Sequence, residues 1–163
     1  PDFWEIAYPK AFRNEVWQAA EAAAVDPLLL LSLARQESRF APSARSAAGA
    51  LGLFQIMPST ADAVGPRVGL DVADRSVILR PDANATLAAG VLSDSMRLFG
   101  DAEVPAVAAY NAGDARTLSW WTAARKIPED LFVDTIPYSG TRNYVRLVYT
   151  NAVRYRTLYG RSF

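Results

Sequence analysis

The sequence contains no cysteine and no histidine among its 163 residues. Without cysteine there is no disulfide, no thiolate nucleophile, no iron–sulfur cluster and no cysteine-rich zinc site. Without histidine there is no Ser-His-Asp triad, no histidine-ligated metal and no imidazole to carry protons near neutral pH. Any acid–base chemistry therefore depends on Asp, Glu, Tyr or Lys.

The chain also lacks net charge and long apolar runs. Lys plus Arg and Asp plus Glu number 17 each, so no overall field attracts nucleic acid or an anionic membrane, and we expect no nucleic-acid partner. No apolar stretch is long enough to span a membrane. With 51% hydrophobic and 21% charged residues, the composition and length are those of one folded domain, which we take as residues 1–163 and expect to be monomeric.

Apolar spacing and capping residues predict helices along most of the chain. Asp26 and Pro27 form an N-cap and first-turn pair that opens a helix, and residues 28–34 are apolar on nearly every side, which places them in the middle of the core. Further helices are expected over 12–23, 58–64, 82–99, 104–112, 115–124 and 141–159, with an ordered loop over 39–51 and a loop containing a helical turn over 65–80. Strand-like alternation is not apparent, so the sequence predicts an all-α domain of roughly six to eight helices.

Glu37 breaks the apolar pattern of the central helix. It follows Ala34, Leu33 and Leu30 by three, four and seven residues, so a continuous helix places its carboxyl group on the same face as three buried side chains. An apolar environment disfavours the charged form and raises the pKa, as a general acid requires. The alternative is that the helix has ended by Gln36, and that Glu37 faces solvent or pairs with a neighbouring arginine.

Three blocks of residues stand at the offsets of a known family. The first contains Gln36-Glu37-Ser38-Arg39-Phe40, Ala48-Gly49-Ala50 and Gly52-Leu53-Phe54-Gln55-Ile56-Met57-Pro58; the second is Ala109-Tyr110-Asn111-Ala112-Gly113; the third contains Ile136-Pro137-Tyr138, Thr141-Arg142 and Tyr144-Val145. From about Asp26 to its end, the chain strongly resembles the soluble lytic transglycosylases, which are relatives of goose-type lysozymes.

This resemblance implies a lysozyme-like fold and a peptidoglycan substrate. The expected reaction cleaves the β-1,4 bond between N-acetylmuramic acid and N-acetylglucosamine, leaving a 1,6-anhydromuramic acid end. Glu37 falls on the family's catalytic acid and base. The resemblance further implies a bacterial periplasmic or cell-envelope location, no metal or organic cofactor, and an origin as the C-terminal part of a longer precursor that carries an additional N-terminal domain.

The resemblance also places seven residues along the substrate groove. They are Ser46, Gln55, Met57, Thr60, Tyr110, Asn111 and Tyr144. Their hydroxyl and amide groups offer donors and acceptors to sugar hydroxyl and acetamido groups, and Tyr110 offers a ring face and a hydroxyl near Glu37. Each residue also has an ordinary structural interpretation, as a polar loop group, a helix-start residue or core filler.

The third block departs from the family at Gly140, where a glutamate commonly precedes Thr141 and Arg142. Two alternatives to the transglycosylase stay open. One is a lysozyme-type muramidase on the same fold, in which water takes the place of the C6 hydroxyl and which the sequence separates poorly from a transglycosylase. The other is a peptidoglycan-binding domain with weak or no activity, which the loss of the carboxylate at Gly140 suggests.

Overall fold

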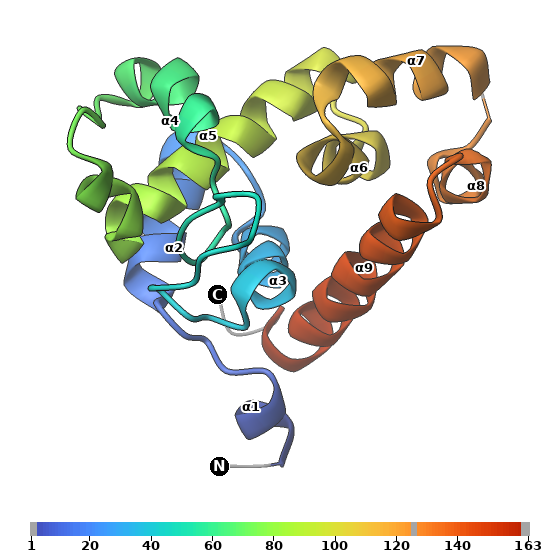
Figure 1. Ribbon diagram of the computed structural model, residues 1–163. Coiled ribbons are helices and arrows are strands. Elements are labelled where there is room, and N and C mark those ends of the chain that lie inside the picture. The colour runs from blue at the N-terminus through green and yellow to red at the C-terminus, as the bar shows by residue number, and fades with distance from the viewer. Residues whose placement is uncertain (1–2, 125–126, 161–163) are drawn as a thin grey trace.

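A computed structural model describes residues 3–124 and 127–160 of the chain. Over these residues the protein has nine α-helices and two short 3₁₀ helices, with no strand beyond two isolated bridges, Arg45 with Leu51 and Leu51 with Ile56 (Figure 1). The α-helices are α1 Phe3–Ala7, α2 Arg13–Ala23, α3 Pro27–Ser38, α4 Pro58–Val64, α5 Pro81–Leu98, α6 Glu103–Ala112, α7 Asp114–Ala124, α8 Glu129–Thr135 and α9 Ser139–Tyr159; the 3₁₀ helices are η1 Gly65–Val68 and η2 Arg75–Leu79. The predicted all-α class is confirmed.

The sequence did not predict α1 and α8. Helix α1 has five residues and none of them is buried, so it carries no apolar stripe to detect. Helix α8 has seven residues and buries only Phe132. Both are too short to show a helical period, although Pro128 followed by two acidic residues is a helix-start signal at α8.

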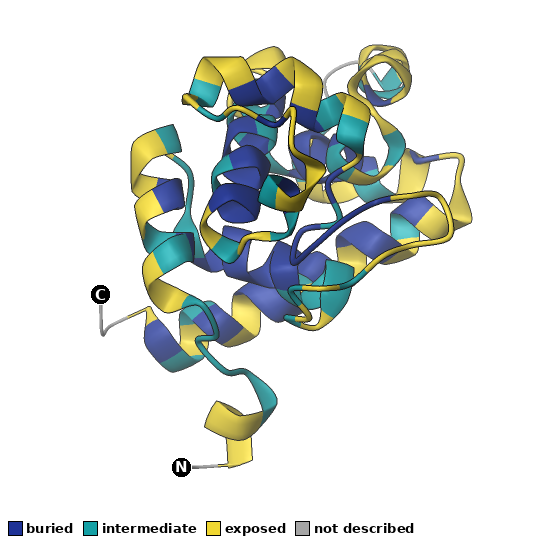
Figure 2. Cartoon of the chain, turned by 60° about the vertical axis from the view of Figure 1, so that its left-hand side comes forward, coloured by how far each residue is buried: buried dark blue, intermediate teal, exposed yellow. Residues whose placement is uncertain are grey.

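Helix α3 lies at the centre of the molecule, as its sequence predicts. The Asp26 carboxylate accepts a hydrogen bond from the backbone N–H of Leu28 at 2.8 Å and so caps the helix. Every residue from Leu28 to Ala34 is buried. Helix α3 packs against α9 and α2, while α5 packs against α2 and α6. In Figure 2 the buried residues lie on the helix faces that point into the body of the molecule, whereas α1 stands clear of that body.

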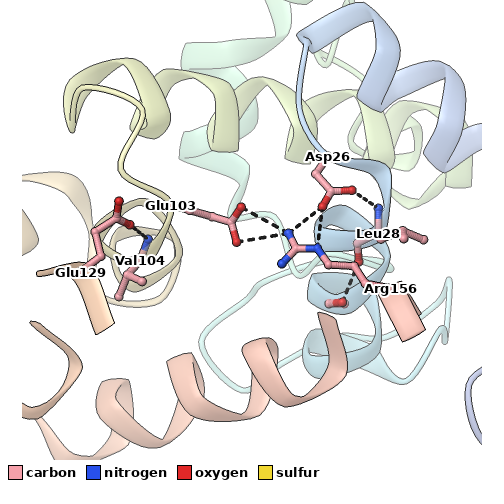
Figure 3. Close-up of polar contacts among 7 residues, drawn as sticks. Asp26, Leu28, Glu103, Val104, Glu129 and Arg156 are labelled. Carbon is pink, nitrogen blue, oxygen red and sulfur yellow. Dashed lines mark hydrogen bonds and ion pairs between the residues drawn. The ribbon is translucent and has the colours of Figure 1, made fainter. Parts of the chain in front are cut away.

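A polar cluster at the N-terminal end of α3 joins three helices. The Arg156 guanidinium of α9 donates to Asp26 at 2.6 Å and to Glu103 of α6 at 3.3 Å (Figure 3). Glu129 accepts a hydrogen bond from the Val104 backbone N–H at 3.0 Å, which caps α6 from α8. These contacts set α3 and α9 side by side and so prepare the site at the opposite end of α3.

Candidate active site

Glu37 lies in the last turn of α3, which continues to Ser38 rather than ending at Gln36. Its face of the helix is the one occupied by Leu30, Leu33 and Ala34, all three fully buried. Burial raises the pKa of the Glu37 carboxyl from an ordinary 4.5 to about 6, and a hydrogen bond from Tyr144 opposes that rise. A substantial fraction of the carboxyl groups therefore holds its proton at slightly acidic pH, as an acid catalyst must.

Two tyrosines surround this carboxyl group, each from a different helix. The Tyr144 hydroxyl of α9 donates to Glu37 Oε1 at 2.6 Å. The Tyr110 hydroxyl of α6 donates to the Phe54 carbonyl at 3.0 Å. Burial, followed by the negative charge of Glu37, raises the pKa of both tyrosines well above 10, so both remain hydrogen-bond donors throughout the neutral range.

The end of α3 is joined to the loop that follows it. The Ser38 hydroxyl donates to the Leu53 carbonyl at 2.8 Å and accepts from the Ala41 backbone N–H. Arg39 ends the helix in the left-handed region, with φ of 53°. Because Ser38 is adjacent to Glu37, these bonds hold the catalytic candidate and the 51–56 loop in one arrangement.

Asn84, fully buried near the start of α5, holds the same loop from the other side. Its amide nitrogen donates to the carbonyls of Leu51 at 3.0 Å and Ile78 at 2.7 Å, and its oxygen accepts from the Phe54 N–H at 2.8 Å. Gly52 approaches this amide so closely that an added Cβ would lie 2.6 Å from Asn84 Nδ2. The sequence did not assign Ser38 or Asn84 a site role, yet an asparagine within the apolar stripe of α5 was a detectable signal.

Four of the predicted groove residues line one cavity of about 200 Å³, which we call the α4–α7 cavity. They are Gln55, Met57, Thr60 and Tyr110, and the remaining lining residues are Ile56, Val91, Ala109, Gly113 and Asp114. Gln55 has a φ of 50°, a conformation that few non-glycine residues adopt, and its side-chain amide donates to the Gly52 carbonyl at 2.9 Å. The loop thus holds the Gln55 backbone in a strained conformation beside this cavity.

The other two groove residues that the structure brings together lie at a second cavity of about 610 Å³, the α9 cavity. Its lining contains Asn111 and Tyr144, together with Gln36, Pro137, Tyr138, Ser139, Gly140, Thr141 and Asn143. Thr141 donates to Asn111 Oδ1 at 2.9 Å, which fixes the amide. An added Cβ at Gly140 would meet no atom within 4 Å, so this position opens onto free space in the cavity wall.

Ser46 is the predicted groove residue that lines neither cavity. Its hydroxyl accepts a hydrogen bond from the Ala50 N–H at 3.0 Å, and its backbone N–H donates to the Ala50 carbonyl at 3.0 Å. These bonds close a tight turn that leads into the 51–56 loop. Its predicted contact with substrate stays a prediction.

Glu37 lines neither cavity, but it interacts with one tyrosine from the lining of each. Its hydrogen-bond partner Tyr144 lines the α9 cavity, and its charge acts on Tyr110, which lines the α4–α7 cavity. Tyr110 and Asn111 are consecutive residues of α6, yet each lines a different cavity. A proton-bearing carboxyl group that interacts with residues of two cavities suits the cleavage of a chain molecule that occupies both. Among the described residues no cluster of His, Cys, Asp or Glu is arranged to hold a metal ion.

The fold is the lysozyme-like all-α fold of the lytic transglycosylases. Its similarity to the 70 kDa soluble lytic transglycosylase of Escherichia coli has a TM-score of 0.90 at 31% identity, covering 98% of this chain and 26% of that one. For Slt of Pseudomonas aeruginosa, solved as an inactive mutant with glutamine in place of a glutamate, the TM-score is 0.88 at 34% identity, covering 96% and 26%.

Sequence comparison agrees with the structural one. A profile of the transglycosylase SLT domain matches residues 15–133, and this chain belongs to that family. The soluble lytic murein transglycosylase of Salmonella typhimurium is 32% identical over 163 residues, which is 99% of this chain and 25% of the relative. This chain therefore spans about a quarter of the length of this curated relative.

Proposed function

We propose that this domain cleaves peptidoglycan glycan strands by lytic transglycosylation, with Glu37 as the one catalytic acid and base. The observation that carries the proposal is the raised pKa of a half-buried glutamate that interacts with two tyrosines, each of which lines a different cavity. Relatives named murein transglycosylases support the substrate. Because murein is cell-wall material, we infer that the domain works in the cell envelope, as a periplasmic, monomeric part of a longer protein.

The proposed reaction needs one carboxyl group in two protonation states. Protonated Glu37 donates its proton to the glycosidic oxygen as the bond to C1 of the muramic acid breaks, and the substrate's N-acetyl group stabilises the positive charge at C1. The Glu37 carboxylate then removes the proton of the C6 hydroxyl, whose oxygen bonds to C1. The acid is regenerated, a 1,6-anhydro sugar is formed, and no water is consumed.

Tyr144 serves both states of this cycle. Its hydroxyl donates to the carboxylate at 2.6 Å and keeps the pKa of Glu37 from rising further. The ionised form of Glu37, which acts as the base, therefore stays accessible. Burial and this hydrogen bond account for the shift of Glu37 within the described part of the chain. Ordinary glycosidases place a second carboxyl group within about 10 Å of the first; in the proposed reaction the substrate's N-acetyl group takes over its role.

The test is mass spectrometry of the products released from purified peptidoglycan strands. We expect muropeptides that end in an anhydro sugar, lighter by one water than hydrolysed ones, and Glu37→Gln should abolish their release. Reducing-end products would establish the lysozyme-type alternative. Binding to strands without cleavage would establish the binding-domain alternative, in which Gly140 has cost the domain its activity.

The pH dependence tests the role of the acid separately. Because free Glu37 must carry its proton to act as an acid, kcat/KM is expected to fall about tenfold per pH unit above its pKa of about 6. A value of kcat/KM that stays constant between pH 5 and pH 8 would contradict the assignment.

A further inference from the structure

Asp114 is the one carboxylate in the described lining of the α4–α7 cavity, and neither the sequence motifs nor the proposed mechanism uses it. It begins α7 directly after Gly113, whose φ of 89° lets the chain turn out of α6. The Asp114 residue is exposed, so a ligand in the cavity has access to it. It shares this cavity lining with four of the predicted groove residues, Tyr110 among them.

A buried neighbour holds the Asp114 carboxylate in place. The Ser95 hydroxyl of α5, which is 1% exposed, donates to Asp114 Oδ1 at 2.8 Å. An ionised carboxylate accepts about four hydrogen bonds over its two oxygens. This single bond therefore orients the group and leaves most of its accepting capacity for a ligand.

The remaining walls of the cavity indicate what that ligand is. Met57, Ile56 and Val91 offer apolar contacts, while Gln55 and Thr60 offer amide and hydroxyl groups. A space of about 200 Å³ with this mixture suits an acetamido sugar, which has a methyl group, ring hydroxyls and an amide N–H. Hydroxyl and amide N–H groups are donors, and a carboxylate accepts from them with stronger bonds than a neutral acceptor does.

We propose that Asp114 binds a hydroxyl or acetamido N–H of the sugar residue that occupies the α4–α7 cavity, and so contributes to substrate affinity. This inference rests on the proposed function, because it assumes that the groove holds a glycan strand. The bond forms away from the reacting atoms and is present before and during the reaction. It therefore affects KM and leaves kcat unchanged.

The experiment compares Asp114→Ala, Asp114→Asn and Ser95→Ala on peptide-free glycan strands. We expect Asp114→Ala to raise KM about tenfold at unchanged kcat, as loss of a hydrogen bond to a charged group predicts. Asp114→Asn keeps an acceptor without the charge, and is expected to raise KM about threefold. Ser95→Ala removes the bond that orients the carboxylate but leaves its charge in the cavity, so its KM is expected to rise about threefold, less than for Asp114→Ala.

A purely structural role gives a different pattern. If Asp114 only joins α7 to α5, Asp114→Ala and Ser95→Ala lower the melting temperature together and leave KM unchanged, which overturns the proposal. An effect of Asp114→Ala that is seen only with peptide-bearing strands also overturns it, because the carboxylate then binds an ammonium group of the peptide.

If the domain does not cleave strands, their binding still tests the sugar contact of Asp114. Failure of the proposed function shows as the absence of anhydro products from wild type. In that case the dissociation constant for peptide-free strands, measured for wild type and Asp114→Ala, decides: a rise of about tenfold supports the sugar contact, and equal constants overturn it.

Discussion

Glu37 shows how the two protonation states of one side chain are balanced by its surroundings. Burial favours the neutral acid, and the Tyr144 hydroxyl favours the carboxylate; burial is the larger effect, so the pKa rises to about 6. The same imbalance reduces the stability of the fold when the group is ionised. Below its unfolded pKa the carboxyl is neutral in both states, and the penalty appears as the pH rises from about 4.5 through 6.

Replacing Glu37 by Gln is therefore expected to stabilise the protein at pH 7.5 while abolishing activity. A shift of this size corresponds to about 2 kcal/mol, and we expect a gain of about 1–2 kcal/mol because solvent reaches part of the side chain. Urea unfolding of wild type and variant at pH 4 and pH 7.5 measures it. The difference should vanish at pH 4, and Glu21→Gln on the exposed face of α2 should show no such gain at either pH. A constant difference at both pH values would contradict the linkage to ionisation.

At the scale of the element, the 51–56 loop is the part of the site with the most stringent geometry. Ser38 joins it to α3, Tyr110 joins it to α6, and Asn84 joins it to α5. Three helices thus set one loop, whose Gln55 backbone adopts a strained conformation beside the α4–α7 cavity. Such strain persists only where the surrounding contacts over-determine the conformation.

Gly52→Ala and Gly49→Ala form a matched pair that tests the loop. Both glycines have positive φ, 78° and 91°, so an alanine costs each about 1 kcal/mol in backbone strain. Only at Gly52 does the new Cβ strike Asn84, at 2.6 Å. We expect Gly52→Ala to lower the free energy of unfolding by about 2 kcal/mol more, as hydrogen bonds of Asn84 are lost. Equal destabilisation of the two variants in urea would show that Asn84 does not constrain the loop.

At the scale of the whole molecule, α9 links both ends of α3. Its N-terminal half supplies Tyr144 to Glu37, and its C-terminal half supplies Arg156 to Asp26, the N-cap of α3. Arg156 also reaches Glu103 at the start of α6 (Figure 3). The three charged side chains are 29–39% exposed, so their interaction is less screened than that of surface pairs.

Arg156→Met should therefore cost far more stability than Arg146→Met. Removing Arg156 leaves two partly buried carboxylates without their cation, for which we expect a loss of about 2 kcal/mol. Arg146 pairs with Asp134 at the surface, where the side chains are 59% and 69% exposed, and its loss should cost at most about 0.5 kcal/mol. Thermal unfolding of both variants at low salt compares them, and similar melting temperatures would refute a structural role for the cluster.

The sequence by itself determined the helical class, the central helix and the unusual glutamate. These features are local: Asp26 and Pro27 start a helix, residues 28–34 are apolar on nearly every side, and Glu37 follows on the same face. Through the resemblance of its motifs to a family, the sequence also predicted seven groove residues. The structure brings six of them together at two cavities. Helix α8 escaped because it buries only Phe132 and so shows no apolar stripe.

Only the tertiary structure decided what surrounds each of these residues. Tyr144 is 107 positions from Glu37 in the chain, and no spacing rule connects them. The direction in which the pKa of Glu37 moves follows from burial, but its size depends on that distant hydroxyl. Likewise Tyr110 and Asn111 are neighbours in sequence that line separate cavities, and Ser46 lines neither. Periodicity records which face of a helix is buried, whereas the partners on that face are set by how the helices pack against one another.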